Sequence, residues 1–176
     1  MRFTHVLSDE HGYAYTYSKH MELIDGSDML VIRSTLTNTG TKAILEDQYN
    51  HNFFTIDSET PGPQYDVKLA FAPDDGSISP PEEYAVMEGN KLVYLRDVRR
   101  SFLLKLSGFG DSPSDGRVVI ENTHTGAGVD IGGDFPLYGF NLYSSGSAVC
   151  PEIFVKIHVE PGETQKWTRS YRFFSR

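Results

Sequence analysis

The sequence lacks the features that define several protein classes. Its single cysteine, Cys150, leaves no internal disulfide, so the chain does not depend on an oxidising compartment. No apolar run approaches the length of a membrane span. The chain does not open with a basic region followed by an apolar stretch, so no signal peptide is indicated. We therefore expect a cytoplasmic protein without membrane contact.

An excess of positive charge is missing as well. The formal net charge is -8 and the isoelectric point is near 5.2. A protein that binds nucleic acid regardless of sequence needs a basic face to replace the counterions of the phosphates. The charge therefore argues against nucleic acid as a partner and is compatible with a neutral small molecule.

Motifs for a metal or a cofactor are also missing. No two histidines have a metal-ligand spacing such as His-x-x-x-His, and Cys150 stands alone. There is no Gly-x-Ser-x-Gly nucleophile elbow, and the glycines do not form a dinucleotide-binding fingerprint. We therefore expect neither a metal nor a cofactor.

What the chain does contain is alternation of apolar and polar residues with a period of two. No window shows a sustained helical stripe, whereas Tyr13, Tyr15 and Tyr17 alternate with the small residues Ala14, Thr16 and Ser18, as in a strand. Many short strands at close spacing predict an all-β sandwich or barrel in a single domain over residues 1–176. The expected strands are 2–7, 13–23, 30–37, 65–71, 91–95, 101–106, 117–122, 136–143, 152–159 and 165–174. Residues 72–81 are expected to form a surface loop or lid.

The stretch 49–54, Tyr-Asn-His-Asn-Phe-Phe, concentrates aromatic and amide side chains around one histidine. We expect His51 on a strand or at its end, sharing a face with Tyr49 and Phe53. Asn50 and Asn52 offer both donors and acceptors, which suits a ligand rich in hydroxyl groups. A histidine bonded to backbone within the core would fit the pattern equally well.

A second concentrated stretch, residues 149–155, contains Glu152. In the expected strand, Ile153 and Val155 share the core face, while Glu152 and Phe154 share the other. Pro151 favours an extended backbone before the glutamate. Alternation alone also fits a solvated outer face for Glu152. We predict that this stretch meets residues 49–54 and that together they form a sugar site with an acid and a base.

These segments resemble the galactose mutarotase-like, or aldose 1-epimerase-like, superfamily. The resemblance rests on the strand pair ending at residues 36–40, on residues 49–54, on residues 149–152 and on the last turn and strand, 160–171. The chain resembles the later portion of the family domain, and the early strands of that domain have no counterpart in the sequence. It implies a shortened β-supersandwich that binds a pyranose in a groove without a cofactor.

The resemblance also implies roles for individual residues. Glu152 would be the general base that takes the proton of the anomeric hydroxyl, and His51 the general acid that protonates the ring oxygen. The substrate-binding residues expected around them are Tyr49, Asn50, Asn52 and Phe54. The alternative is a non-catalytic carbohydrate-binding or accessory domain on the same scaffold. A shortened sandwich would expose a sheet edge, which predicts a homo-oligomer that covers it.

Overall fold

Most of the expected strands form in the computed structural model, which describes residues 1–75 and 83–176. Its elements in chain order are β1 (Arg2–Ser8), β2 (Ala14–Leu23), β3 (Met29–Asn38), β4 (Ile44–Gln48), β5 (Tyr65–Leu69), β6 (Ala85–Glu88), β7 (Lys91–Tyr94), β8 (Phe102–Leu106), the short 3-10 helix η2 (Pro113–Gly116), β9 (Val118–Asn122), β10 (Ala127–Gly133), β11 (Gly139–Ser144), β12 (Val149–Val159) and β13 (Thr164–Ser175).

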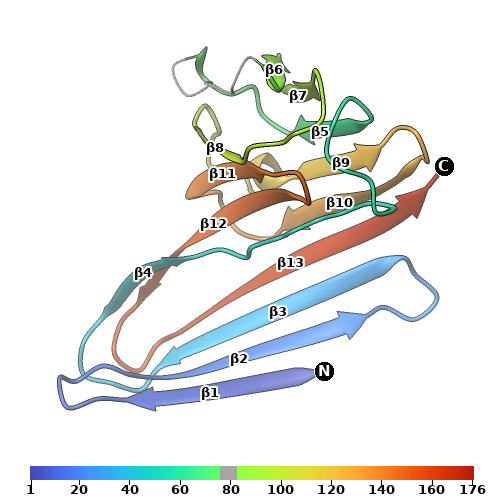
Figure 1. The fold of residues 1–176 in the computed structure, drawn as a ribbon. Helices are drawn as coiled ribbons and strands as arrows, with labels where there is room; N and C mark the ends of the chain where they lie inside the picture. The colour runs from blue at the N-terminus through green and yellow to red at the C-terminus, as the bar shows by residue number, and fades with distance from the viewer. Residues whose placement is uncertain (76–82) are drawn as a thin grey trace.

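The strands form two antiparallel sheets (Figure 1). Within the described residues, the large sheet has nine strands in the order β1-β2-β3-β13-β10-β9-β5-β7-β6, and the small sheet has four in the order β4-β12-β11-β8. Two sheets in face-to-face layers make a β-sandwich, which confirms the predicted fold class. Among the described residues, no helix has the length and apolar character needed to cross a membrane.

The core fills the space between the two sheets. Ile153, Val155 and Ile157 of β12 point inward from the small sheet, and Val67 and Ile120 point inward from the large one. Each fully buried branched side chain stabilises the fold by about 1.5–3 kcal/mol. The alternation predicted for β12 is therefore present, and it leaves Glu152 on the outer face of the small sheet.

Three strands lie outside the expected ranges. Strand β4 was anticipated only as the stretch that leads to His51, the short strand β6 was missed, and the glycine-rich residues 127–133 form β10 in the centre of the large sheet. A side chain on Gly128 would lie 2.3 Å from the Cζ atom of Phe174 in β13, so this glycine makes room for an aromatic ring. Strand β12 begins at Val149, earlier than expected, and includes Pro151. The predicted loop at 72–81 falls largely outside the described residues, since 76–82 are not described.

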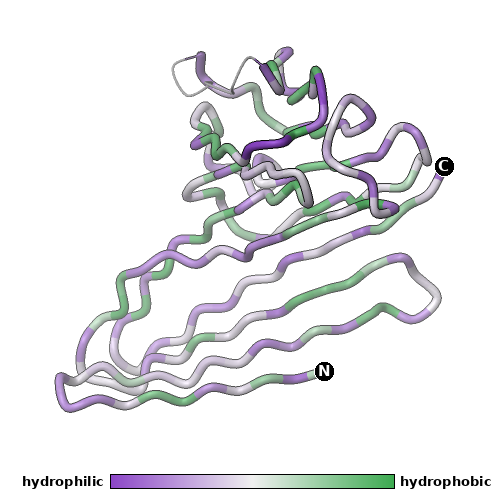
Figure 2. The backbone as a smooth tube through the Cα atoms, in the orientation of Figure 1, coloured by the Kyte–Doolittle hydropathy of each residue, from purple (hydrophilic) through white to green (hydrophobic). Residues whose placement is uncertain are grey.

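Strand β1 is one edge of the large sheet, and β6 is the other edge among the described residues. In Figure 1, β1 and β2 extend beyond the small sheet, away from β8, β11 and β12. Figure 2 shows hydrophobic segments along β1, β2 and β3 as well as in the strands where the two sheets face each other. The large sheet is therefore wider than the layer that covers it.

Candidate functional site

Glu152 lies near the centre of the small sheet, on the face turned away from the core. The neighbouring strand β11 places Asn141 directly opposite Glu152. The Nδ2 amide of Asn141 donates a hydrogen bond of 2.9 Å to Oε2 of Glu152. The Glu152 side chain is only 9% exposed. It is therefore a carboxylate held in place, rather than the solvated residue that alternation alone allowed.

His51 meets this carboxylate from the edge of the sheet. Its Nε2 atom lies 3.2 Å from Oε1 of Glu152. Close by, the backbone of Phe54 exchanges hydrogen bonds of 2.8 and 3.0 Å with Val149. The His51 side chain is 54% exposed, which excludes a core histidine. The two stretches therefore meet in space, as expected, while the catalytic roles of His51 and Glu152 stay predictions.

The segment that carries His51 runs beside β12 without forming a continuous strand. Strand β4 ends at Gln48, opposite Val155, and an isolated bridge joins Phe54 to Val149. Between these two pairs each chain advances by six residues, from 48 to 54 and from 155 to 149. The register is thus unchanged across the gap. His51 lies beyond the end of the strand on which we had expected it, but it keeps the position opposite Glu152.

Pro151 contributes to the gap. In an antiparallel pair, every second residue points its backbone groups at the same neighbour, and Val149 points them at Phe54. Pro151 would therefore have to donate to Asn52, but proline has no N–H group. The bond from residue 151 to Asn52 is therefore absent, and the carbonyl of Pro151 accepts from the Nδ2 amide of Asn52 at 2.9 Å. A side-chain hydrogen bond thus joins the two segments at this point.

Aromatic rings surround His51 on its outer side. The ring of Tyr49 stacks on Phe154 at 4.4 Å and meets the imidazole edge-on at 5.0 Å. On the other side Phe53 stacks on His51 at 5.4 Å and contacts Tyr143 at 6.1 Å. These rings form a continuous row beside Glu152. Their flat faces suit the apolar face of a sugar ring, and the row also restricts the orientations of His51.

The two asparagines point to the other side of the segment. The hydroxyl of Tyr171 in β13 donates to Oδ1 of Asn52 at 2.9 Å and accepts from Nδ2 of Asn50 at 3.2 Å. Burial raises the pKa of the Tyr171 phenol, so the hydroxyl keeps its proton. The ring of Phe54 packs beside Tyr171 at 6.3 Å. Asn50, Asn52 and Phe54 thus anchor the segment from inside, and their predicted contact with a sugar stays a prediction.

Gln48, the last residue of β4, is held by β13, the strand that carries Tyr171. Its Oε1 atom accepts from Nε1 of Trp167 and from Nη2 of Arg169, both at 3.1 Å, and its backbone carbonyl accepts from Arg169 at 3.2 Å. Its Nε2 amide donates to Oδ1 of Asn50 at 2.9 Å. Alternation along β13 places Trp167, Arg169 and Tyr171 on one face. The sequence did not reveal that this face holds the His51 segment.

An open cavity of about 500 Å³ lies on the inner side of the segment, against the exposed end of β3. Its lining residues include Lys19, Ile32, Asn50, His51 and Tyr171. Glu152 is not among them. A ligand could therefore reach His51 from the outer Glu152 face or from this inner cavity, and only the outer face brings it to the carboxylate.

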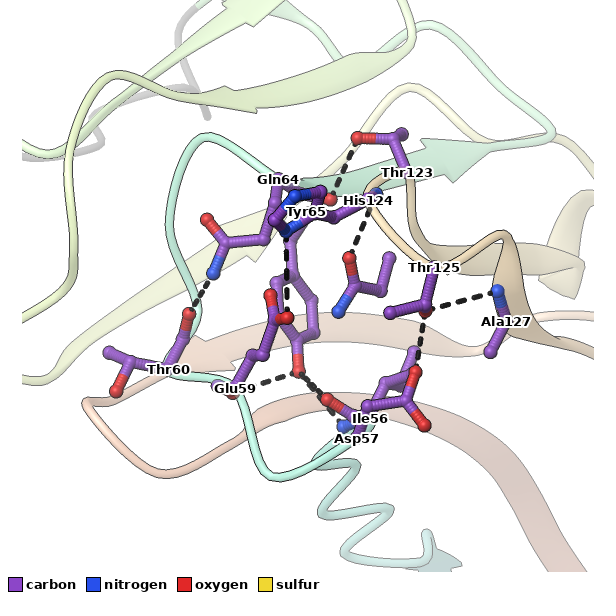
Figure 3. Close-up of polar contacts among 11 residues, drawn as sticks. Ile56, Asp57, Glu59, Thr60, Gln64, Tyr65, Thr123, His124, Thr125 and Ala127 are labelled. Atoms are coloured by element: carbon purple, nitrogen blue, oxygen red, sulfur yellow. Dashed lines mark hydrogen bonds and ion pairs between the residues drawn. The ribbon is translucent and has the colours of Figure 1, made fainter.

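The loop that follows Phe54 is fixed by the buried Tyr65 (Figure 3). The Tyr65 hydroxyl accepts from the amide of Ile56 at 2.8 Å and lies within hydrogen-bonding distance of the carbonyl of Glu59, at 3.0 Å. Asp57 accepts a hydrogen bond from Thr125 and has a positive φ of 54°, in the left-handed region. These contacts fix the end of the His51 segment on the side away from β4.

No metal-binding cluster is present in the described part of the chain, where no three His, Cys, Asp or Glu side chains are grouped suitably. The single cysteine, Cys150, is buried in β12, two residues before Glu152. Burial, together with the charge of Glu152, raises the pKa of its thiol to about 11. The thiol is therefore protonated at neutral pH and is a poor nucleophile.

No family model matches the chain, and no curated protein sequence does either. Many solved structures of aldose 1-epimerase-like and galactose mutarotase-like proteins are similar to it, at low sequence identity. A proposed aldose 1-epimerase from Klebsiella pneumoniae has a TM-score of 0.72 at 12% identity, with coverage of 98% of this chain and 50% of its own.

A galactose mutarotase-like protein from Lactobacillus casei has a TM-score of 0.68 at 16% identity, with coverage of 98% of this chain and 69% of its own. An aldose epimerase homologue from C. elegans has a TM-score of 0.66 at 12% identity, with coverage of 98% and 68%. The chain thus spans about 50–69% of the length of these structures. Its architecture is the galactose mutarotase-like β-sandwich.

Proposed function

We propose that the chain is an aldose 1-epimerase-type isomerase that interconverts the anomers of a sugar. The observation that carries this proposal is the 3.2 Å contact between Nε2 of His51 and Oε1 of Glu152. The similar structures support the fold, and the acid–base pair on its open face supports the activity. Glu152 acts as the general base and His51 as the general acid.

The distance between the two groups suits this reaction. The anomeric hydroxyl and the ring oxygen are attached to the same carbon, so an acid and a base that serve them must be close together. Glu152 takes the proton of the anomeric hydroxyl, the bond from C1 to the ring oxygen breaks, and that oxygen takes the proton of His51. Rotation about C1–C2 and closure by the reverse steps give the other anomer and return both protons.

The surroundings of the pair match a neutral, hydroxyl-rich substrate. Asn141 fixes one carboxylate oxygen of Glu152 and leaves the other directed at His51. The ring faces of Tyr49 and Phe53 flank the imidazole and offer stacking surface to a pyranose. Since His51 is half exposed, its side chain has room to admit a sugar between itself and the carboxylate.

Polarimetry of freshly dissolved α-glucose and α-galactose tests the proposal. The protein is expected to accelerate mutarotation, Glu152→Gln to remove most of the acceleration, and His51→Ala to reduce it by on the order of 10²-fold or more. His158→Ala is the matched control, because His158 lies on the same strand as Glu152 and forms an exposed pair with Glu160 at 2.9 Å, just beyond the end of that strand. Folded protein that accelerates no sugar in a panel of hexoses and pentoses would refute an epimerase.

A non-catalytic sugar-binding domain is the second candidate. It is favoured by the length of the chain, which spans only 50–69% of the similar structures. Isothermal titration calorimetry separates the two. Sugar binding that survives Glu152→Gln, in a protein without mutarotase activity, supports the binding domain and contradicts the enzyme.

A further inference from the structure

The outer face of the small sheet continues beyond Glu152, and the ladder register shows which residues lie there. Directly opposite residues of an antiparallel pair point to the same side of a sheet. Asn141 of β11 lies opposite Glu152 of β12 and also opposite Lys105 of β8. These three side chains therefore form one row across the sheet, named here the polar row. His51 lies at the Glu152 end of the polar row.

Aromatic side chains border the polar row on both sides. Phe154 lies two residues beyond Glu152 on the same face of β12, and the ring of Tyr49 stacks on it at 4.4 Å. The other border is Tyr143 of β11, whose ring contacts Phe53 at 6.1 Å. A sugar placed over Glu152 therefore meets an aromatic ring in either direction along the strands.

These borders leave one direction for a pyranose ring that lies along the face. The proposed reaction places the anomeric carbon between His51 and Glu152, so His51 occupies that end of the polar row. The aromatic rings occupy the two sides, and a sugar that stood away from the sheet would leave their surfaces unused. The pyranose therefore extends from Glu152 across β11, over Asn141, whose amide is already bonded to the carboxylate.

Lys105 lies where the far end of such a ring arrives. Neighbouring strands are about 4.8 Å apart, so the backbone of Lys105 is roughly 10 Å from that of Glu152, and its long side chain can bend back over the polar row. Lys105 is exposed on β8, the last strand of the small sheet among the described residues. Its amine forms no ion pair or hydrogen bond within the described ranges, so it is available to a ligand.

The chemistry of a pyranose decides which of its groups reaches Lys105. C4 is the ring carbon opposite the anomeric carbon, so its hydroxyl extends furthest along the polar row. An equatorial C4 hydroxyl, as in glucose, continues the long axis of the ring, whereas an axial one, as in galactose, is perpendicular to the ring. An ammonium group is a charged donor, and its hydrogen bond to such an oxygen is stronger than one between neutral groups.

We propose that Lys105 is a specificity-determining residue of the isomerase and donates a hydrogen bond to an equatorial C4 hydroxyl of the sugar. The inference rests on the proposed function, because that function places the anomeric carbon at His51 and Glu152. A site that bonds a particular hydroxyl discriminates against an analogue that lacks it or carries it in another direction. The substrate class is therefore an aldopyranose with the configuration of glucose at C4.

Polarimetry with glucose, galactose and 4-deoxyglucose tests this inference. The wild type is expected to have a kcat/KM for glucose about tenfold or more above the values for the other two sugars. Lys105→Met removes the amine and keeps an unbranched side chain. It should lower kcat/KM for glucose by about tenfold or more and change the other two values by less than about twofold. Lys105→Arg retains a charged donor and should keep the preference for glucose.

Lys156→Met is the matched control, because Lys156 lies on the same face beyond Phe154, with its amine over the ring of Tyr138 at 5.5 Å. It should leave all three values unchanged. If Lys105→Met loses activity equally for every sugar, or loses none, the inference is overturned while the isomerase stands. A wild type that accelerates none of these sugars refutes the isomerase instead. Titration calorimetry with glucose and 4-deoxyglucose then decides on Lys105: equal affinities overturn its role, and a preference for glucose that Lys105→Met removes supports it.

Discussion

Replacement of Tyr171 by phenylalanine tests how the His51 segment is held. The change removes one oxygen and leaves the ring against Phe54 in place. That oxygen donates to Oδ1 of Asn52 and accepts from Nδ2 of Asn50. Two hydrogen bonds are worth about 1–3 kcal/mol in net stability, and a buried amide oxygen left without a donor costs about 1–3 kcal/mol.

Water from the adjoining cavity of about 500 Å³ can replace the partner of Asn50, which lines it. Asn52 lines the same cavity but is only 8% exposed, so water compensates less for the hydrogen bond that its Oδ1 atom loses. We therefore expect Tyr171→Phe to lower the free energy of unfolding by about 2–4 kcal/mol. Urea unfolding measures this value, and the imidazole NMR signal of His51 should shift because its segment loses an anchor.

Tyr138→Phe is the control. The Tyr138 side chain is exposed, and no hydrogen bond of its hydroxyl is found in the described part of the chain. It should change stability by less than about 0.5 kcal/mol, as surface substitutions usually do. If Tyr171→Phe also stays within about 0.5 kcal/mol and leaves the His51 signal unmoved, these bonds do not hold the segment and our reasoning is refuted.

Two further predictions concern Asn141 and Asp130. Asn141→Ala should lower kcat for mutarotation by about tenfold with little change in KM, because the Asn141 amide orients Glu152 and is not expected to bind the sugar itself. Polarimetry over a range of sugar concentrations checks this, and a change in KM alone would contradict it. Hydrogen bonds from Arg117 hold the pKa of Asp130 below its usual value. Its stabilising effect is therefore complete above the unfolded pKa of about 3.9 and is lost as the pH falls through the lower folded pKa. Urea unfolding should show the wild type losing more stability than Asp130→Asn over that acidic range, and parallel curves would contradict it.

The period of two was sufficient to predict most of the strands, because alternation directly reflects burial on one face of a sheet. It failed at β10, where glycines broke the alternation. At Gly128 the ring of Phe174 in β13 occupies the space that a side chain would need. Phe174 is far from Gly128 in the sequence, so no local pattern could have revealed why a glycine stands at this point of the strand.

The outer half of the candidate site was more predictable than the inner half. Alternation predicts which residues share a face with Glu152, and the resemblance predicts that His51 and Glu152 belong to one site. The inner contacts could not be predicted, because Asn52 and its partner Tyr171 are 119 residues apart in the sequence. Asn141 was missed for a related reason: only the register of β11 against β12 places it opposite Glu152.

Pro151 links these two halves of the site. It removes one backbone donor beside Glu152 and so weakens the ladder between β4 and β12 near His51, yet the bridge at Phe54 keeps the register. The proposed base, Glu152, is thus fixed in a strand with an amide on its second oxygen, whereas the proposed acid, His51, lies on a segment held by side-chain hydrogen bonds. The same arrangement explains why Tyr171, which touches neither group, is expected to control where His51 lies.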